Sequence, residues 1–168
     1  DNMRIVHFSG DILPVKYLRI LQESMPGATF YNIYGQTEAN SSMCFRVDKA
    51  QIDDTKPIPI GKPFPNFEVF AMDGDRVVSE PDEEGELYVK SSTVAIGYWG
   101  EDRMTLEKFP ADPRRSQIHS RVYRTGDIVK MGADGNYSFV GRKDHMIKSK
   151  GYRIEIPEIE NVIQNHES

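Results

Sequence analysis

The sequence is poor in cysteine and has no long apolar segment. Cys44 is the only cysteine among 168 residues, so an intrachain disulfide is impossible and a cysteine metal site is not supported. We therefore expect a reducing, cytoplasmic setting. No run of about 18 apolar residues is present, and the first residues, DNMRIVHFSG, lack the basic-then-apolar pattern of a signal peptide. We expect no membrane insertion.

A positive charge excess is also missing. The formal net charge of -5 argues against nucleic acid as the main partner. The four histidines are scattered without ligand spacing, which does not support a histidine metal site. With 38% hydrophobic and 28% charged residues, 13 Gly and 10 Pro, the composition is that of a loop-rich globular protein. The chain begins without Met in a strand-like run, so we expect a piece of a longer protein.

The first third of the chain has the pattern of an α/β unit. The run RIVHF predicts a buried strand, and apolar residues at helical spacing predict a helix over residues 13–25 that ends before Pro26. ATFYNIY predicts the next strand. Strand, helix and strand within about thirty residues form a parallel crossover, whose ligands gather at the carboxyl ends of the strands. We assign residues 1–55 to the end of an α/β subdomain.

The pattern changes at about residue 56, where KPIPIGKPFPNF breaks any helical period. The runs FEVFAM, RVVS, GELYVKSS, DIVKM and NYSFVG follow, separated by turn compositions. They predict an antiparallel sheet or small barrel over residues 56–140, in which Trp99 is a packing residue. Residues 141–168 predict one or two strands and then a helix that starts near Pro157.

The stretch YGQTE, Tyr34 to Glu38, follows the second predicted strand directly. A glycine lets the backbone approach a ligand, an aromatic ring can lie on another π-face, and Thr and Glu oxygens suit a phosphate and its Mg²⁺. Taken alone, the stretch is more typical of a surface loop after a strand, since Thr-Glu pairs are common.

Two further stretches carry polar groups. In YRTGD, the carboxylate of Asp127 follows a glycine and can accept both hydroxyls of a ribose, although a turn aspartate in a hairpin has the same pattern. The third stretch, GRKDHMIKSKGYRIEIPEIE, is rich in Lys and Arg around two glycines. It fits either a solvated basic face or a cationic strip that meets phosphates.

Together, and in this order, the stretches YGQTE, GELYVKSSTVAIGYWG, YRTGD and GRKDHMIKSKGYRIEIPEIE resemble the AMP-forming adenylate synthetases. This superfamily includes acyl-CoA synthetases, firefly-type luciferases and the adenylation domains of nonribosomal peptide synthetases. The resemblance spans nearly the whole chain. It implies the rear part of the large adenylation domain, with a distorted β-barrel, then the hinge and the start of the small C-terminal α+β domain.

The resemblance also implies roles for the residues of YGQTE. Tyr34 would stack on adenine, with Asn32 beside the base and Gly35 in the same nucleotide-binding segment. Thr37 would touch the α-phosphate, and Glu38 would hold Mg²⁺. These last two residues are therefore the expected catalytic pair of this stretch.

The later motifs receive roles in the same way. Asp127 would bind the ribose hydroxyls, with Arg142 near the same ribose, and Asp144 would be the hinge between the two domains. Lys148, a catalytic candidate, and Gly151 would lie on the face that is brought up for the thioester step. The candidates for the acid pocket are Phe8, Ser9, Gly10, Ile33, Ser41 and Ser42.

The resemblance implies an enzyme that activates a carboxylic acid with ATP and Mg²⁺ and passes the acyl group to a thiol. The phosphate loop and the lysine of the small domain would lie outside this chain, so we expect the fragment itself to be inactive. Its motifs look closest to synthetases that load amino acids or similar small acids onto carrier proteins, including the D-alanine carrier-protein ligases. A CoA ligase for aryl or fatty acids and a non-catalytic β-rich interaction module remain alternatives.

Overall fold

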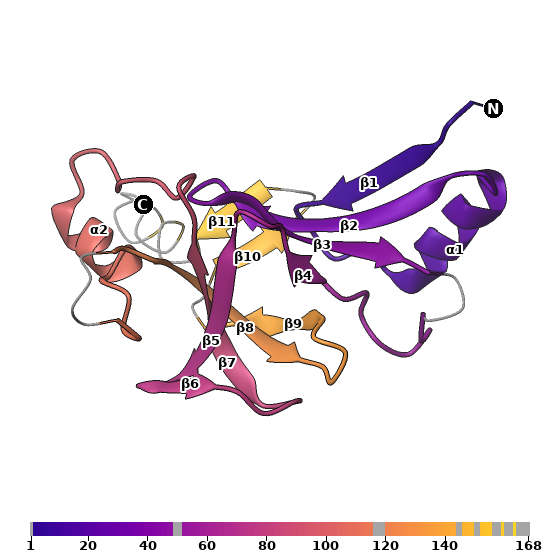
Figure 1. The fold of residues 1–168 in the computed structure, drawn as a ribbon. Helices are drawn as coiled ribbons and strands as arrows, with labels where there is room; N and C mark the ends of the chain where they lie inside the picture. Colours follow the sequence, from indigo (N-terminus) through magenta and orange to yellow (C-terminus); the bar gives the residue numbers. More distant parts are fainter. Residues whose placement is uncertain are drawn as a thin grey trace.

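The computed structural model describes residues 2–48, 52–115, 120–143, 146–149 and 152–155, together with Ile159 and Ile163. Its strands form a four-stranded, a five-stranded and a two-stranded sheet (Figure 1). The elements are β1 (Ile5–Ser9), α1 (Val15–Ser24), β2 (Thr29–Gln36), β3 (Asn40–Val47), β4 (Lys62–Pro63), β5 (Glu68–Asp73), β6 (Arg76–Val78), β7 (Glu84–Lys90), α2 (Asp102–Lys108), β8 (Tyr123–Met131), β9 (Tyr137–Arg142), β10 (Met146–Ser149) and β11 (Tyr152–Glu155).

The four-stranded sheet has the order β1-β2-β3-β4 and begins with the predicted crossover. β1 and β2 pair in parallel, and α1 connects them. Leu18 of α1 is buried against Phe30 of β2 and Phe45 of β3, because the helix directs its apolar stripe at the sheet. The predicted strand, helix and strand are confirmed. β3 was not predicted, and it makes a hairpin with β2 in place of the expected polar loop.

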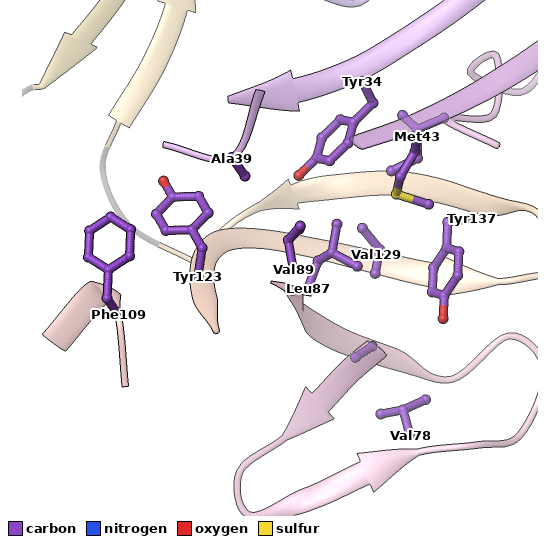
Figure 2. Close-up of a cluster of buried hydrophobic side chains, with 12 residues drawn as sticks. Tyr34, Ala39, Met43, Val78, Leu87, Val89, Phe109, Tyr123, Val129 and Tyr137 are labelled. Atoms are coloured by element: carbon purple, nitrogen blue, oxygen red, sulfur yellow. The ribbon is translucent and has the colours of Figure 1, made fainter. Parts of the chain in front are cut away.

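The five-stranded sheet is antiparallel with the order β6-β5-β7-β8-β9. Among the described residues no pairing joins β6 to β9, so the strands form an open sheet, one of the two forms expected. Its core shares side chains with the first sheet. Figure 2 shows Tyr34 and Met43 directed toward Leu87, Val89 and Val129, all of them buried. Each such side chain contributes about 1.5–3 kcal/mol when fully buried, so this shared core fixes the two sheets relative to each other.

A short bridge at Gly61 also joins the two sheets. The Gly61 carbonyl accepts from the Tyr137 amide at 2.8 Å, and the Gly61 amide donates to the Tyr137 carbonyl at 3.2 Å. Gly61 has φ +86°, and a Cβ at this position would lie 2.0 Å from the Cys44 carbonyl oxygen. Both facts require glycine here.

The last described segments follow the predicted order. β10 and β11 form an antiparallel hairpin, in which Lys148 pairs with Arg153. Ile159 and Ile163 are helical and exposed, whereas the rest of the predicted helix lies outside the described residues. Asp144 and Gly151 lie outside them as well. The short helix α2 was not predicted, and it buries none of its residues. In the described part of the chain, no helix is long and apolar enough to cross a membrane.

Candidate nucleotide site

The β2–β3 hairpin positions the YGQTE stretch. Tyr34 and Gln36 end β2, and the chain turns through Thr37 to Ala39 into β3. The ladder shifts register between Tyr34 and Gly35, where a Cβ on Gly35 would lie 2.1 Å from the Asn40 carbonyl oxygen. The glycine is therefore required by the close approach of the neighbouring strand.

Asp127 lies in β8 and is held from two sides. Its backbone amide donates to Thr125 Oγ1 at 3.0 Å, and that hydroxyl donates to the Leu87 carbonyl at 2.7 Å. Arg142 is its partner across the β8–β9 ladder, and Arg142 Nη1 donates to Asp127 Oδ1 at 2.6 Å and to the Thr125 carbonyl at 2.8 Å. The Asp127 side chain is only 1% exposed, so this charge-assisted bond supplies the counter-charge that a buried carboxylate needs.

The YGQTE stretch reaches the other oxygen of the same carboxylate. The Tyr34 hydroxyl donates to Asp127 Oδ2. Gln36 Nε2 donates to Oδ2 at 2.7 Å and also contacts the Tyr34 hydroxyl oxygen. Burial, followed by the charge of Asp127, raises the pKa of Tyr34 well above its ordinary value, so the phenol stays protonated and donates. Residues from three of the four motifs therefore meet at Asp127.

A cavity of about 320 Å³ adjoins this cluster. Its size lies at the lower end of the range for small-molecule sites. Asn32 borders it and donates from Nδ2 to the Pro59 carbonyl at 2.8 Å. The lining residues are Gly10, Asp11, Ile12, Leu13, Asn32, Ile33, Tyr34, Gly35, Pro57, Ile58, Ile60, Phe139, Gly141 and Arg142. Six of these were predicted as site residues. The remaining apolar ones, to which the sequence analysis gave no site role, are Ile12, Leu13, Pro57, Ile58, Ile60 and Phe139.

Glu38 lies at the other end of the turn and is buried, with 6% exposure. Its Oε1 accepts a hydrogen bond from the Tyr98 hydroxyl at 2.7 Å, and its carbonyl accepts from the Ala95 amide at 2.8 Å. Thr37 beside it is exposed. The described residues contain no group of three or more His, Cys, Asp or Glu side chains that could hold a metal. Glu38 fits Mg²⁺ as one carboxylate ligand beside phosphate and water oxygens.

Sequence reasoning missed two members of this site. Gln36 stands inside YGQTE and received no role, although its alternation with Tyr34 along a strand could have indicated that both reach the same neighbour. Tyr98 precedes Trp99 in GYWG, and its contact with Glu38 spans sixty positions of sequence. Trp99 itself is fully exposed, so its assignment as a packing residue is wrong.

The remaining candidates are placed as follows. Phe8 packs in the cluster beneath α1, whereas Ser9 and Gly10 are exposed. Ser42 is buried, and its hydroxyl donates to the Tyr34 carbonyl at 3.4 Å, while Ser41 is exposed. Of these predicted acid-pocket residues, together with Ile33, only Gly10 and Ile33 line the cavity. Lys148 is described only by its place in β10.

Residues 1–99 match the family model described as AMP-binding enzyme. The chain belongs to the AMP-binding enzyme family. It is 38% identical to an L-proline–L-prolyl-carrier protein ligase of Streptomyces coelicolor, covering 98% of this chain and 30% of that protein. It is also 38% identical to gramicidin S synthase 2 of Brevibacillus brevis, covering 98% of this chain and 4% of the synthase. The chain thus spans less than a third of these curated relatives.

Solved structures agree with the fold. The crystal structure of IdnL1 superposes with a TM-score of 0.91 at 32% identity, over 96% of this chain and 33% of that one. The structure of PA1221, described as an NRPS protein containing adenylation and PCP domains, gives 0.86 at 31% identity, over 96% and 33% of the two chains. The α/β unit followed by antiparallel strands is therefore part of the architecture of adenylation domains.

Proposed function

We propose that the protein containing this chain activates an amino acid, or another small carboxylic acid, with ATP. The acid would displace pyrophosphate from ATP to form an acyl-adenylate, and the acyl group would then pass to a thiol. The observation that carries this proposal is the convergence of YGQTE, YRTGD and the Arg142 segment on Asp127, beside a cavity lined by Tyr34 and Asn32.

The proposed roles follow the chemistry of these side chains. Asp127 and Arg142 would hold the ribose, while the Tyr34 ring and Asn32 would contact the adenine from the cavity. Thr37 is exposed at the turn and would donate to the α-phosphate. Glu38, buried and oriented by Tyr98, would hold Mg²⁺, which supplies charge stabilisation to the phosphoryl transfer. The chain's own contribution is to fix these groups in advance of the reaction.

The end of the large domain is proposed to lie at Lys143. The Lys143 backbone amide donates to the Gly126 carbonyl at 2.8 Å, and its Nζ donates to Glu86 at 2.9 Å. These two contacts fix the chain up to that residue, so rotation would begin at Asp144. The proposed division is 1–55, 56–140 and 141–168, in which the last segment contains the final residues of the large domain, the hinge at Asp144, and the start of the small domain with Lys148 and Gly151.

The acceptor is proposed to be the thiol of a phosphopantetheine carried by a carrier protein. The support comes from relatives, since one is named for an L-prolyl-carrier protein and a solved neighbour contains a PCP domain beside its adenylation domain. Transfer to CoA is the competing possibility. The proposal further places the protein in the cytoplasm, with neither nucleic acid nor membrane lipid as its partner.

The direct test is ATP–pyrophosphate exchange by the full-length protein with a panel of amino and carboxylic acids. We expect exchange with one class of acid, followed by loading of a phosphopantetheinylated carrier protein in preference to CoA. Absence of exchange with every acid would contradict the proposal. The 168-residue chain alone should give no exchange. Exchange above background by this chain would contradict the proposal that it carries only part of the active site.

The hinge assignment has its own test. Asp144→Pro would fix φ near -65° and restrict the residue before it. We expect near-normal exchange in the full-length protein with strongly reduced transfer to the thiol, because only transfer requires the small domain to rotate. Equal losses in both half-reactions would contradict a hinge at this position.

A further inference from the structure

One oxygen of the Asp127 carboxylate has no acceptor capacity left. A carboxylate oxygen offers about two lone-pair positions. Oδ2 already accepts from the Tyr34 hydroxyl and from Gln36 Nε2, whereas Oδ1 accepts one side-chain bond, from Arg142. A vicinal diol that places one hydroxyl on each oxygen therefore needs a donor on Oδ2 to leave.

The burial of Asp127 also requires that the side chains around it move before a sugar diol can reach the carboxylate. The carboxylate is 1% exposed and is absent from the cavity lining, whereas Tyr34 and Arg142 are part of that lining. Tyr34 and Arg142 thus stand between Asp127 and the space where a nucleotide would lie, whereas Gln36, the third side chain bonded to the carboxylate, does not line the cavity. Access requires a rearrangement of the cap.

Gln36 is the donor to Asp127 that carries a buried polar atom without a hydrogen-bond partner among the described residues. Its Nε2 makes both contacts of the amide, while Oε1 is buried and has no hydrogen-bond partner among the described residues. A buried acceptor left without a partner is costly, so part of the gain at Nε2 is cancelled. Moving this side chain aside frees a position on Oδ2 and relieves the buried oxygen in the same step.

We propose that Gln36 competes with the sugar diol for Asp127 and thereby sets the affinity of the site for ribonucleotides. This inference rests on the proposed function, in which Asp127 binds the ribose. In the free protein the amide caps Oδ2, and the diol binds only to the fraction of molecules in which the cap is open. The apparent dissociation constant is then the intrinsic one divided by that fraction.

The proposal predicts that losing the amide tightens binding, the opposite of what the loss of a ligand contact would do. Gln36→Met keeps the length of the side chain and removes the donor. We expect the full-length protein with this substitution to bind ATP about fivefold to tenfold more tightly, because the lost bond to a charged group, about tenfold or more by itself, is partly offset in the wild type by the unpaired Oε1. Binding of 2′,3′-dideoxy-ATP should stay unchanged, because that ligand has no diol and does not need the cap to open.

The experiment is isothermal titration calorimetry of ATP and 2′,3′-dideoxy-ATP with wild type, Gln36→Met and the control Gln22→Met. Gln22 is also a buried glutamine but packs in α1, so its substitution should leave both affinities at the wild-type values. Should Gln36→Met fail to fold by circular dichroism, Gln36→Asn decides the question, since its shorter amide is withdrawn from Oδ2.

The outcomes separate this inference from the function it rests on. If the wild type prefers ATP over the dideoxy nucleotide and the Gln36 variant binds ATP equally or more weakly, competition by Gln36 is refuted and the role of Asp127 stands. If neither the wild type nor the Gln36 variant prefers ATP over the dideoxy nucleotide, Asp127 does not hold the ribose, and the assignment and this inference both fail. A larger preference for ATP in the variant supports the proposal.

Discussion

Glu86 links the five-stranded sheet to Lys143, the residue that precedes the proposed hinge. The carboxylate is buried in β7 and accepts from Arg124 Nε at 2.8 Å, from Arg124 Nη2 at 3.0 Å and from Lys143 Nζ at 2.9 Å. Burial raises the pKa of Glu86, but the hydrogen bonds and charges of Arg124 and Lys143 outweigh it and leave the pKa below its ordinary value. Glu86→Gln keeps the shape and removes this charge.

The solvent exposure of Arg124 and Lys143 determines how much stability the Glu86→Gln substitution removes. Breaking a fully buried ion pair by removing one partner costs about 3–5 kcal/mol. The side chains of Arg124 and Lys143 are 30% and 53% exposed, so both cations regain part of their hydration when the carboxylate is lost. We therefore expect Glu86→Gln to cost about 2 kcal/mol of local stability.

Amide hydrogen exchange in the full-length protein measures this cost locally. The Lys143 amide, bonded to the Gly126 carbonyl, should exchange about 30-fold faster, since 1.4 kcal/mol corresponds to about tenfold. Glu84→Gln is the matched control, because Glu84 lies in the same strand and pairs with Lys130 at 3.0 Å with both side chains well exposed. A Glu86→Gln effect no larger than that of the control would refute the reasoning.

The pH dependence of this difference follows from the lowered pKa. A carboxyl whose pKa is lower in the folded than in the unfolded state contributes its full stability above the unfolded value, about pH 4.3 for Glu. That contribution is lost as the pH falls through the lowered folded value. The exchange difference between wild type and Glu86→Gln should therefore be complete at pH 6 and diminish only below about pH 4.

Three further substitutions test other parts of the site. Asp127→Ala should weaken ATP binding about tenfold to a hundredfold and slow both half-reactions, because the ribose is held in each of them; unchanged binding by calorimetry would remove Asp127 from the site. Glu38→Gln should lower ATP–pyrophosphate exchange with partial recovery in excess Mg²⁺, whereas Tyr98→Phe keeps the charge and loses only the bond that orients it, so it should shift the Mg²⁺ dependence less than Glu38→Gln does. Gly61→Ala should lower the melting temperature clearly more than Gly74→Ala, because both residues have positive φ but only Gly61 would clash with backbone.

Local patterns predicted the elements that make local contacts. The helix over residues 13–25 was visible because Leu18 and Leu21 recur on one face, and the strands after residue 66 were bounded by turn residues such as Gly74 and Gly135. β3 was missed because its first residues, Asn40 to Ser42, are small and polar and hide the apolar alternation that begins at Met43. Its conformation is decided by the hairpin that it forms with β2, which the composition of β3 alone does not indicate.

Several residues of the candidate site were predictable one by one, but the contacts between them were not. The motifs identified Tyr34, Asp127 and Arg142 one by one, and the structure brings all three into one hydrogen-bonded cluster. The contact between Tyr34 and Asp127 spans 93 positions of sequence and depends on the packing of two sheets. No local pattern encodes such a contact. Tyr98 at Glu38 was missed for the same reason.

The order of residues in YGQTE follows from the hairpin and from the carboxylate that it faces. Successive side chains of a strand point to opposite faces, so Tyr34 and Gln36 can both reach Asp127 while the residue between them faces away. That residue meets the Asn40 carbonyl of β3, which leaves room only for glycine. The turn then begins at Thr37 and leaves it exposed, and Glu38 is buried against Tyr98. One short hairpin thereby presents a hydroxyl and an amide to Asp127, and a carboxylate to a second part of the site.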